Sequence, residues 1–183
     1  MKVHETEIKG LLLVELRFLS DDRGFFTRHY CADTLREAGL TKSIKQINHT
    51  LTKKTGALRG LHFQAPPMSE TKIVRCIRGS VFDVAVDLRA QSPTFLQWRA
   101  QELSAENGML YVIPDGFAHG YQALTDEVEM FYLHTENYAR EFEGGIRYDD
   151  PRLAIGWPRA VTDISERDMN LPLLEPGFAG FHL

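Results

Sequence analysis

Apolar and polar residues alternate in short runs over most of the segment between residues 44 and 135. The runs are rich in β-branched and aromatic residues and are interrupted by Gly, Pro and Asn, which is the pattern of short β-strands. Helical periodicity is scarce elsewhere. Many short strands with a few short helices predict a mainly β protein, a β-sandwich or barrel, of which the cupin-like jelly roll is one version.

The best helix candidate lies in the first quarter of the chain. Asp33 is a suitable N-cap, and residues 34–38 continue the helix. Gly39 suits the left-handed position at which many helices end.

The clearest local signal is a β-hairpin in which residues 72–78 and 81–88 flank Gly79-Ser80, a two-residue turn. Pairing Arg78 with Val81 divides the side chains between two faces. We expect the apolar face to be core: Ile73, Ile77, Phe82, Val84, Val86 and Leu88. The other face fits either the lining of a polar pocket or a solvated surface with an ion pair: Lys72, Val74, Cys76, Asp83, Ala85 and Asp87.

Composition limits the classes of protein to consider. The 183 residues are 43% hydrophobic, and because no repeat or linker divides them, residues 1–183 are expected to form a single domain. No stretch approaches the ~20 apolar residues that cross a bilayer. The first residues do not resemble a signal peptide, so we expect a soluble, cytoplasmic protein without a membrane partner.

Charge and cysteine content exclude further classes. The net charge of −4 comes without a dense Lys/Arg block, which argues against nucleic acid as a partner. Cys31 and Cys76 lack CxxC spacing, so we expect packing residues rather than a disulfide or a zinc site.

Two segments have the outline of a cupin metal site. Residues 56–64 resemble the first cupin motif, whose usual His-x-His pair and downstream Glu bind a metal, and residues 114–119 resemble the second. Gln64 replaces the second His of the pair, and Glu70 lies later than the usual Glu. Because two imidazoles without a supporting carboxylate make a poor transition-metal site, we predict a cupin-like pocket with no metal and no cofactor.

Without a metal, His62 and His119 become candidates for proton transfer, because histidine titrates near neutrality. Arg59 and His62 have opposite strand parity, so both face one pocket only if the strand bulges, which Gly60 permits. Tyr132 shares a strand face with Val128 and Met130 and, on pattern alone, fits a core tyrosine. Other residues fit ordinary surface or hydrogen-bonding roles on pattern alone: His29, His49, His134, Arg23, Arg59 and Lys72.

Motifs of several common enzyme classes are missing. The chain contains no GxGxxG, Walker-type loop, GxSxG or HExxH, which removes the usual dinucleotide, phosphate-loop, serine-hydrolase and zinc-protease hypotheses. Spacing alone therefore leads to a metal-free pocket with acid–base residues and names no substrate.

A series of short segments spans most of the chain: DRGFF at 22–26, QIN at 46–48, LRGLHFQ at 58–64, FDVAVDLR at 82–89, SPT at 92–94, LSAEN at 103–107, IPDGFAHG at 113–120, DDP at 149–151 and SERD at 165–168. In these segments and in their order, the chain resembles the dTDP-4-dehydrorhamnose 3,5-epimerase family. Several motifs in order are far more specific than any one of them.

The resemblance implies a role for each candidate site residue. His62 would accept a proton with the help of Asp168, Tyr132 would donate one on the opposite face of the sugar, and Lys72 would stabilise the enolate oxygen. The resemblance also implies a homodimer, a dTDP-linked sugar as substrate, and a set of substrate-binding residues: Arg23, Ile47, Asn48, His49, Arg59, His119 and Glu143, with Tyr138 stacking on the base. A base and an acid on opposite faces convert proton removal and return into inversion.

One position departs from the family pattern Asp-x-Arg-Gly-x-Phe-x-Glu. Arg28 stands where the pattern ends in a substrate-side Glu, so a donor-only cation replaces an acceptor-only anion. We count Arg28 among the substrate-binding residues and expect it to alter specificity.

The expected function is epimerisation at C3 and/or C5 of a dTDP-4-dehydro-6-deoxyhexose, in deoxysugar or dTDP-rhamnose biosynthesis. One alternative is a single-centre epimerase acting on another nucleotide-linked 4-keto sugar. A metal-dependent cupin is a second alternative, against which Gln64 argues. A non-catalytic sugar-binding jelly roll is a third, and it would not need the acid–base set.

Overall fold

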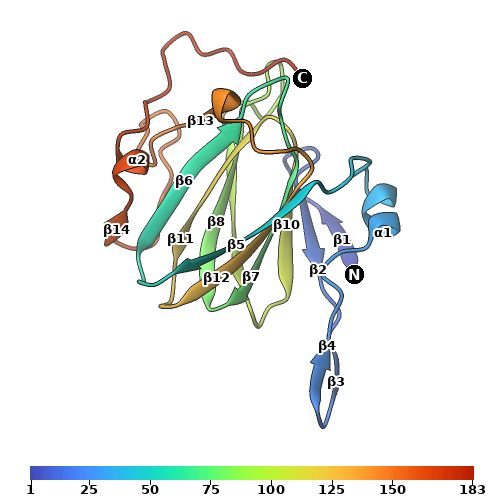
Figure 1. Ribbon diagram of the computed structural model, residues 1–183. Helices are drawn as coiled ribbons and strands as arrows, with labels where there is room; N and C mark the ends of the chain where they lie inside the picture. The colour runs from blue at the N-terminus through green and yellow to red at the C-terminus, as the bar shows by residue number, and fades with distance from the viewer.

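The computed structural model describes residues 1–183 as two antiparallel sheets packed face to face (Figure 1). The first sheet has the strand order β1 (Lys2–Glu5), β2 (Leu12–Glu15), β10 (Met109–Ile113), β7 (Lys72–Arg78), β12 (Val128–His134), β5 (Gln46–Thr52). The second has the order β13 (Glu143–Gly145), β6 (Ala57–Gln64), β11 (Phe117–Ala123), β8 (Ser80–Asp87), β9 (Trp98–Ser104), and β14 (Asp163–Ile164) pairs with β6. The predicted mainly β, jelly-roll class is confirmed.

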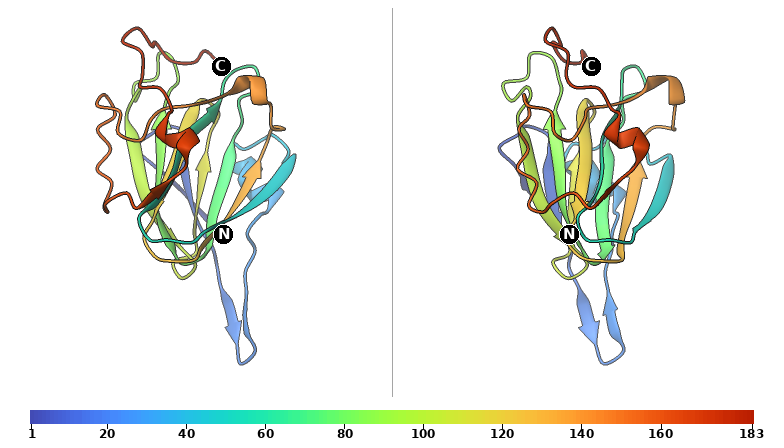
Figure 2. Two further views of the ribbon diagram at one scale, coloured as in Figure 1. Left: turned by 60° about the vertical axis from the view of Figure 1, so that its left-hand side comes forward. Right: turned by 90° about the vertical axis from the view of Figure 1, so that its left-hand side faces the viewer.

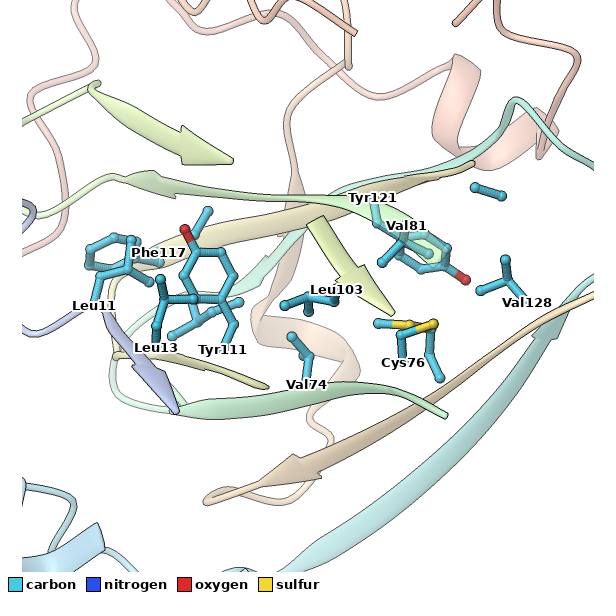
Figure 3. Close-up of a cluster of buried hydrophobic side chains, with 14 of the residues drawn as sticks. Leu11, Leu13, Val74, Cys76, Val81, Leu103, Tyr111, Phe117, Tyr121 and Val128 are labelled. Carbon is cyan, nitrogen blue, oxygen red and sulfur yellow. The ribbon is translucent and has the colours of Figure 1, made fainter. Parts of the chain in front are cut away.

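The largest core cluster lies between the two sheets (Figure 3). It draws on alternate residues of strands from both sheets, including Val74 and Cys76 of β7 and Val81 and Ala85 of β8. Residues on the opposite strand faces are also covered. Ile73 packs outward beneath α1 (Ala32–Glu37), while Val84 and Val86 pack beneath the C-terminal segment. Both faces of the central strands are thus buried.

The predicted hairpin is wrong. β7 pairs with β10 and β12, whereas β8 pairs with β11 and β9, so Arg78 and Val81 are not partners. Gly79, with φ +73°, carries the chain from one sheet to the other. A glycine turn between two strand-like runs suits a hairpin and a sheet-to-sheet corner equally, because only glycine reaches this backbone region without strain. The alternation within each strand was correctly predicted.

Helix α1 begins earlier than expected. Its N-cap is Cys31, which makes no side-chain cap, and Asp33 lies in the first turn rather than at the cap. Leu35 anchors the helix, being buried against the first sheet. Gly39 has φ +97°, as the sequence predicted for the residue after the helix.

Two segments extend beyond the sheets. The strands β3 (Leu19–Asp21) and β4 (Gly24–Phe26) form an arm that projects from one end of the molecule (Figure 2). Its side chains Phe25 and Phe26 are 67% and 61% exposed. The C-terminal segment, which contains α2 (Glu166–Met169), runs beside β6 and covers the second sheet. A 3-10 turn, η1 (Arg140–Phe142), precedes β13. No helix is long and apolar enough to span a membrane.

Candidate active site

A polar pocket of about 470 Å³ opens between the two sheets, and only 4 of its 16 lining residues are hydrophobic. The first sheet contributes side chains from β5, β7 and β12: Gln46, Asn48, Thr50, Lys72, Tyr132 and His134. The second sheet contributes side chains from β6 and β11: Arg59, His62, Phe63, Gln64, His119 and Tyr121. A cavity of this size and polarity suits a ligand rich in hydrogen-bonding groups.

A histidine–aspartate pair forms one wall. Nε2 of His62 lies 2.8 Å from Oδ1 of Asp168, and the other Asp168 oxygen accepts the Gly60 N–H at 3.0 Å. Asp168 is set at the start of α2, where its N–H donates to the N-cap side chain of Ser165. Burial opposes ionisation of Asp168, but the hydrogen bond and charge of His62, together with the hydrogen bonds of Gly60 and Ser165, outweigh burial and lower the pKa of Asp168 below its usual value. Asp168 therefore accepts the Nε2 proton, and Nδ1 of a neutral His62 ring remains a free base.

A bulge in β6 places Arg59 and His62 on the same wall. Across β11, Tyr121 is the partner of Arg59 and His119 the partner of His62, so β6 holds one extra residue between them. Gly60 has φ +114°, and a Cβ there would lie 2.6 Å from the Cα of Gly120. The bulge that the sequence predicted at Gly60 is confirmed, and it depends on glycine.

A second histidine–aspartate pair lies deeper. Nε2 of His119 is 3.0 Å from both carboxylate oxygens of Asp83, and the Asp83 side chain is fully buried. Burial raises the pKa of Asp83, although the nearby His119 works against that rise.

The opposite wall carries a buried tyrosine. Tyr132 projects from β12 on the same side as Val128 and Met130, as predicted, and packs against the core between the sheets. Its hydroxyl accepts a 3.4 Å hydrogen bond from Thr50, and its ring centroid is 6.2 Å from that of His119. Burial raises the pKa of Tyr132 well above its usual value, so this phenol keeps its proton at neutral pH.

A cation lies at the junction of the two walls. Nζ of Lys72 is 3.4 Å from the carbonyl oxygen of His62 and 3.4 Å from a carboxylate oxygen of Glu70. The pocket thus combines a base on one sheet, a protonated phenol on the other, and an ammonium between them. This set can remove a proton beside a carbonyl, neutralise the oxyanion and return a proton from the other side.

The cupin-type ligand positions are engaged in other contacts. Gln64 donates to the backbone oxygens of Met68 and Asn137 and accepts from the N–H of Ala139. No group of three or more His, Cys, Asp or Glu side chains is arranged to hold a metal ion. Independence from metal stays a prediction.

Comparison with known proteins decides the family. The family model described as dTDP-4-dehydrorhamnose 3,5-epimerase matches residues 5–176. The dTDP-4-dehydrorhamnose 3,5-epimerase of Shigella flexneri is 43% identical over 171 residues, which cover 93% of this chain and 94% of the relative. This chain belongs to the dTDP-4-dehydrorhamnose 3,5-epimerase family. Its predicted class, an isomerase acting next to the 4-keto group of a dTDP-linked 6-deoxyhexose, is confirmed.

Solved structures of the family share the fold of this epimerase over nearly all of its length. The Bacillus anthracis enzyme, with TDP and PPi bound, has a TM-score of 0.92 at 42% identity, covering 94% of this chain and 99% of that one. The Legionella pneumophila enzyme, in complex with dTDP-4-keto-L-rhamnose, has a TM-score of 0.92 at 37% identity, covering 100% of this chain and 98% of that one.

The structure brings most of the residues predicted for the epimerase site together. Eight line the pocket: Asn48, Arg59, His62, Lys72, His119, Tyr132, Tyr138 and Glu143. Asp168 lies directly behind His62. At the mouth, the Tyr138 hydroxyl donates to Glu143 at 2.7 Å, and Arg167 contacts the other Glu143 oxygen at 2.7 Å. Tyr138 is 57% exposed, and its ring offers a flat surface at the entrance.

Four predicted residues do not reach the pocket of their own chain. Ile47 and His49 alternate with Asn48 along β5 and lie on the outer face, where His49 contacts Glu129 at 3.0 Å. Arg23 sits at the tip of the arm and pairs with Asp21. Arg28 lines a separate cavity of about 170 Å³ with Phe26 and Cys31. Strand parity turns Ile47 and His49 away from the pocket. The outward course of the arm keeps Arg23 and Arg28 away from it.

Several pocket residues were missed by the sequence prediction. His134 was interpreted as an ordinary hydrogen-bonded residue, yet it lies in the pocket two positions beyond Tyr132 on the same strand face. That period of two was the signal available. Glu70, tested only as a metal ligand, and Asp83, assigned to a face of a hairpin that does not form, are both buried in the site.

Proposed function

We propose that the chain epimerises both C3 and C5 of dTDP-4-dehydro-6-deoxyglucose. The observation that carries this proposal is that His62 and Tyr132 face one pocket from opposite sheets, with Lys72 reaching the backbone of His62 from the Tyr132 sheet. A sugar ring lying between the two sheets would present one face to the base and the other to the phenol.

At each centre the chemistry needs one proton removed and one returned. His62 Nδ1 takes the proton from the carbon beside the ketone, and the C–H electron pair moves into an enolate whose oxygen is met by the Lys72 ammonium. Tyr132 then gives its proton to the opposite face of the same carbon, which inverts the centre. Exchange with water returns both groups to their starting states before the second centre reacts.

The nucleotide part of the substrate would lie at the pocket mouth. The exposed Tyr138 ring would stack on the base, and Arg59 and Glu143 would contact the rest of the nucleotide, while Asn48 and His119 face the sugar. Flat aromatic surfaces and arginine are suited to bases and phosphates, respectively.

The same proposal includes a cytoplasmic homodimer in which the arm completes the pocket of the partner. Arg23 is 89% exposed as a side chain, and the neighbouring Phe25 and Phe26 are exposed as well, which is an unusual state for an apolar arm on an isolated chain. A second copy that covered the arm would bring Arg23 and Arg28 near a nucleotide-sugar. Arg28→Glu would then change the ranking of nucleotide-sugars by kcat/KM.

Proton NMR of the 4-keto sugar nucleotide in heavy water tests the proposed reaction. We expect deuterium at both C3 and C5 and a product with both centres inverted. Deuterium and inversion at one carbon only would establish the single-centre alternative. A substrate that stays unlabelled and unchanged would refute both.

A further inference from the structure

One buried acid in the pocket takes no part in the proton transfers proposed above. Glu70 precedes β7, and its side chain is 8% exposed. One carboxylate oxygen lies 2.8 Å from Nδ1 of His134, and the other lies 3.4 Å from Nζ of Lys72. Because a buried carboxylate is costly without such partners, the two contacts explain how Glu70 is tolerated there.

The contacts of Glu70 also set the direction of a hydrogen-bond chain. Burial opposes its ionisation, but the hydrogen bonds and charges of His134 and Lys72 together outweigh burial and hold the pKa of Glu70 below its usual value. An ionised carboxylate only accepts, so Nδ1 of His134 carries a proton. In a neutral ring Nε2 then accepts, and it lies 3.2 Å from Nδ2 of Asn48. The Asn48 nitrogen is thus engaged, and its carbonyl oxygen is left for the ligand.

Strand register keeps these groups in one row. His134 of β12 is paired with Lys72 of β7 on one side and with Gln46 of β5 on the other. Asn48 lies two residues along β5 from Gln46 and so shares its face. The row ends beside the Tyr132 ring, whose centroid is 6.3 Å from that of His134.

We propose that Glu70 is a positioning residue, which holds the Lys72 ammonium directly and, through His134, presents the Asn48 carbonyl oxygen to the sugar. This proposal rests on the proposed function, because the placement of Lys72 matters only if an enolate forms. The two branches have different kinetic consequences. The contact of Glu70 with Lys72, the Lys72 branch, matters when negative charge develops on the enolate and so affects kcat. The path through His134 to Asn48, the Asn48 branch, sets a contact that the sugar makes as soon as it binds and so affects KM.

Two conservative substitutions separate the branches. Glu70→Gln keeps the shape of the side chain and removes its charge, and we expect kcat to fall about ten-fold or more. His134→Asn keeps a donor toward Glu70 but removes the nitrogen that contacts Asn48, so KM should rise by roughly five-fold with kcat near that of the wild type. Glu15→Gln is the matched control, because Glu15 contacts His4 at 3.2 Å in an exposed pair outside the pocket. It should change neither constant.

Binding of dTDP, measured by calorimetry, reports whether the pocket survives each substitution. We expect all three variants to bind dTDP within about two-fold of the wild type, since the residues proposed to hold the nucleotide, Tyr138, Arg59 and Glu143, are not among those substituted. A Glu70→Gln enzyme with unchanged kcat would overturn the proposal. A parallel loss of dTDP binding would overturn it too, because Glu70 would then support the whole pocket.

The tautomer of His134 provides a test that does not depend on turnover. Nitrogen-15 NMR of the histidine rings, with His134 assigned as the signal missing in His134→Asn, should show a neutral ring with its proton on Nδ1. A proton on Nε2 would overturn the proposal even in an active enzyme. Failure of the proposed function would be recognised separately, as a wild-type chain that shows no exchange and no epimerisation.

Discussion

The two histidine–aspartate pairs of the pocket have similar geometry and different surroundings. His62 and Asp168 are 2.8 Å apart, with the histidine side chain 30% exposed. His119 and Asp83 are 3.0 Å apart, with side-chain exposures of 6% and 0%. The two carboxyl pKa values shift in opposite directions, down for Asp168 and up for Asp83.

Burial raises the pKa of both carboxyl groups, and the number of donors around each one decides whether that rise is overcome. Asp168 accepts hydrogen bonds from His62 and from the Gly60 N–H, and it lies at the start of a helix. Asp83 has only His119 as a partner and no exposure to water. An aspartate orients and activates a base best when its own charge is stabilised, so the pair at the open wall is suited to proton abstraction. The deeper pair is suited to binding the sugar.

The largest expected effect separates the two histidines. His62→Asn should lower the rate of both deuterium exchange and inversion by about 10³-fold or more, because the abstracting face loses its base. His119→Asn should retain exchange, at a rate lower by roughly ten-fold, because it loses one contact to the sugar. NMR in heavy water records exchange and inversion separately. Equal losses in the two variants would mean that the pairs share one role.

A change on the opposite sheet should uncouple exchange from inversion. Tyr132→Phe keeps the base and the ammonium but removes the donor, so inverted product should fall by about 10²-fold while deuterium still enters from the His62 side. The same NMR assay would show labelled substrate of retained configuration. Full inversion in this variant would assign the proton donor to another group.

Substitution of the two aspartates should change the reaction rates by less than substitution of the histidines. In Asp168→Asn a neutral amide faces His62 in place of a charged carboxylate, so the His62 ring is held less well. Exchange and inversion should then slow together by roughly 10- to 100-fold. Asp83→Asn should affect mainly KM, through the orientation of His119. Steady-state kinetics of both variants test this, and a larger loss of kcat for Asp83→Asn would reverse the assignment.

The sequence predicted the parts of this site that depend on strand parity. The strand face of Tyr132 follows from a period of two, and the bulge follows from Gly60. The role of Tyr132 in the site, like that of Asn48, came only from the family resemblance. The pairing of His62 with Asp168 came only from the family resemblance, because more than a hundred residues separate the two and no local pattern connects them.

Pairing between strands was less predictable than the strands themselves. Gly79 was interpreted as a hairpin turn because both flanking runs are strand-like, and nothing local indicates that they belong to different sheets. The consequence for the site is small. Lys72 and Asp83 reach one interior from opposite sheets, which no register within a single hairpin would reveal.

The contributions of the two aspartates to the free energy of unfolding should change with pH in opposite directions. The folded-state pKa of Asp168 lies below the ordinary value of 3.8, so its contribution is present above that value and is lost as pH falls through the folded pKa. The pKa of Asp83 is raised, so its ionisation costs stability as pH rises, and its contribution grows as pH falls. Urea unfolding from pH 6 toward pH 3 should make Asp168→Asn progressively less destabilising and Asp83→Asn progressively more so. Parallel slopes would contradict the opposite pKa shifts.

The smallest expected effect is that of a chelator. A metal bound by His62 and His119 would join the two pairs into one site, and each ring would have to turn away from its aspartate to bind through Nε2. Gln64, the third position of a cupin set, is held by three backbone contacts and offers no anionic ligand. We therefore expect exhaustive treatment with a chelator to leave kcat/KM within about two-fold of its starting value. Elemental analysis accompanies the assay. Stoichiometric iron, manganese or zinc, with activity lost on its removal and restored on its return, would show that the two histidines act through a shared ion.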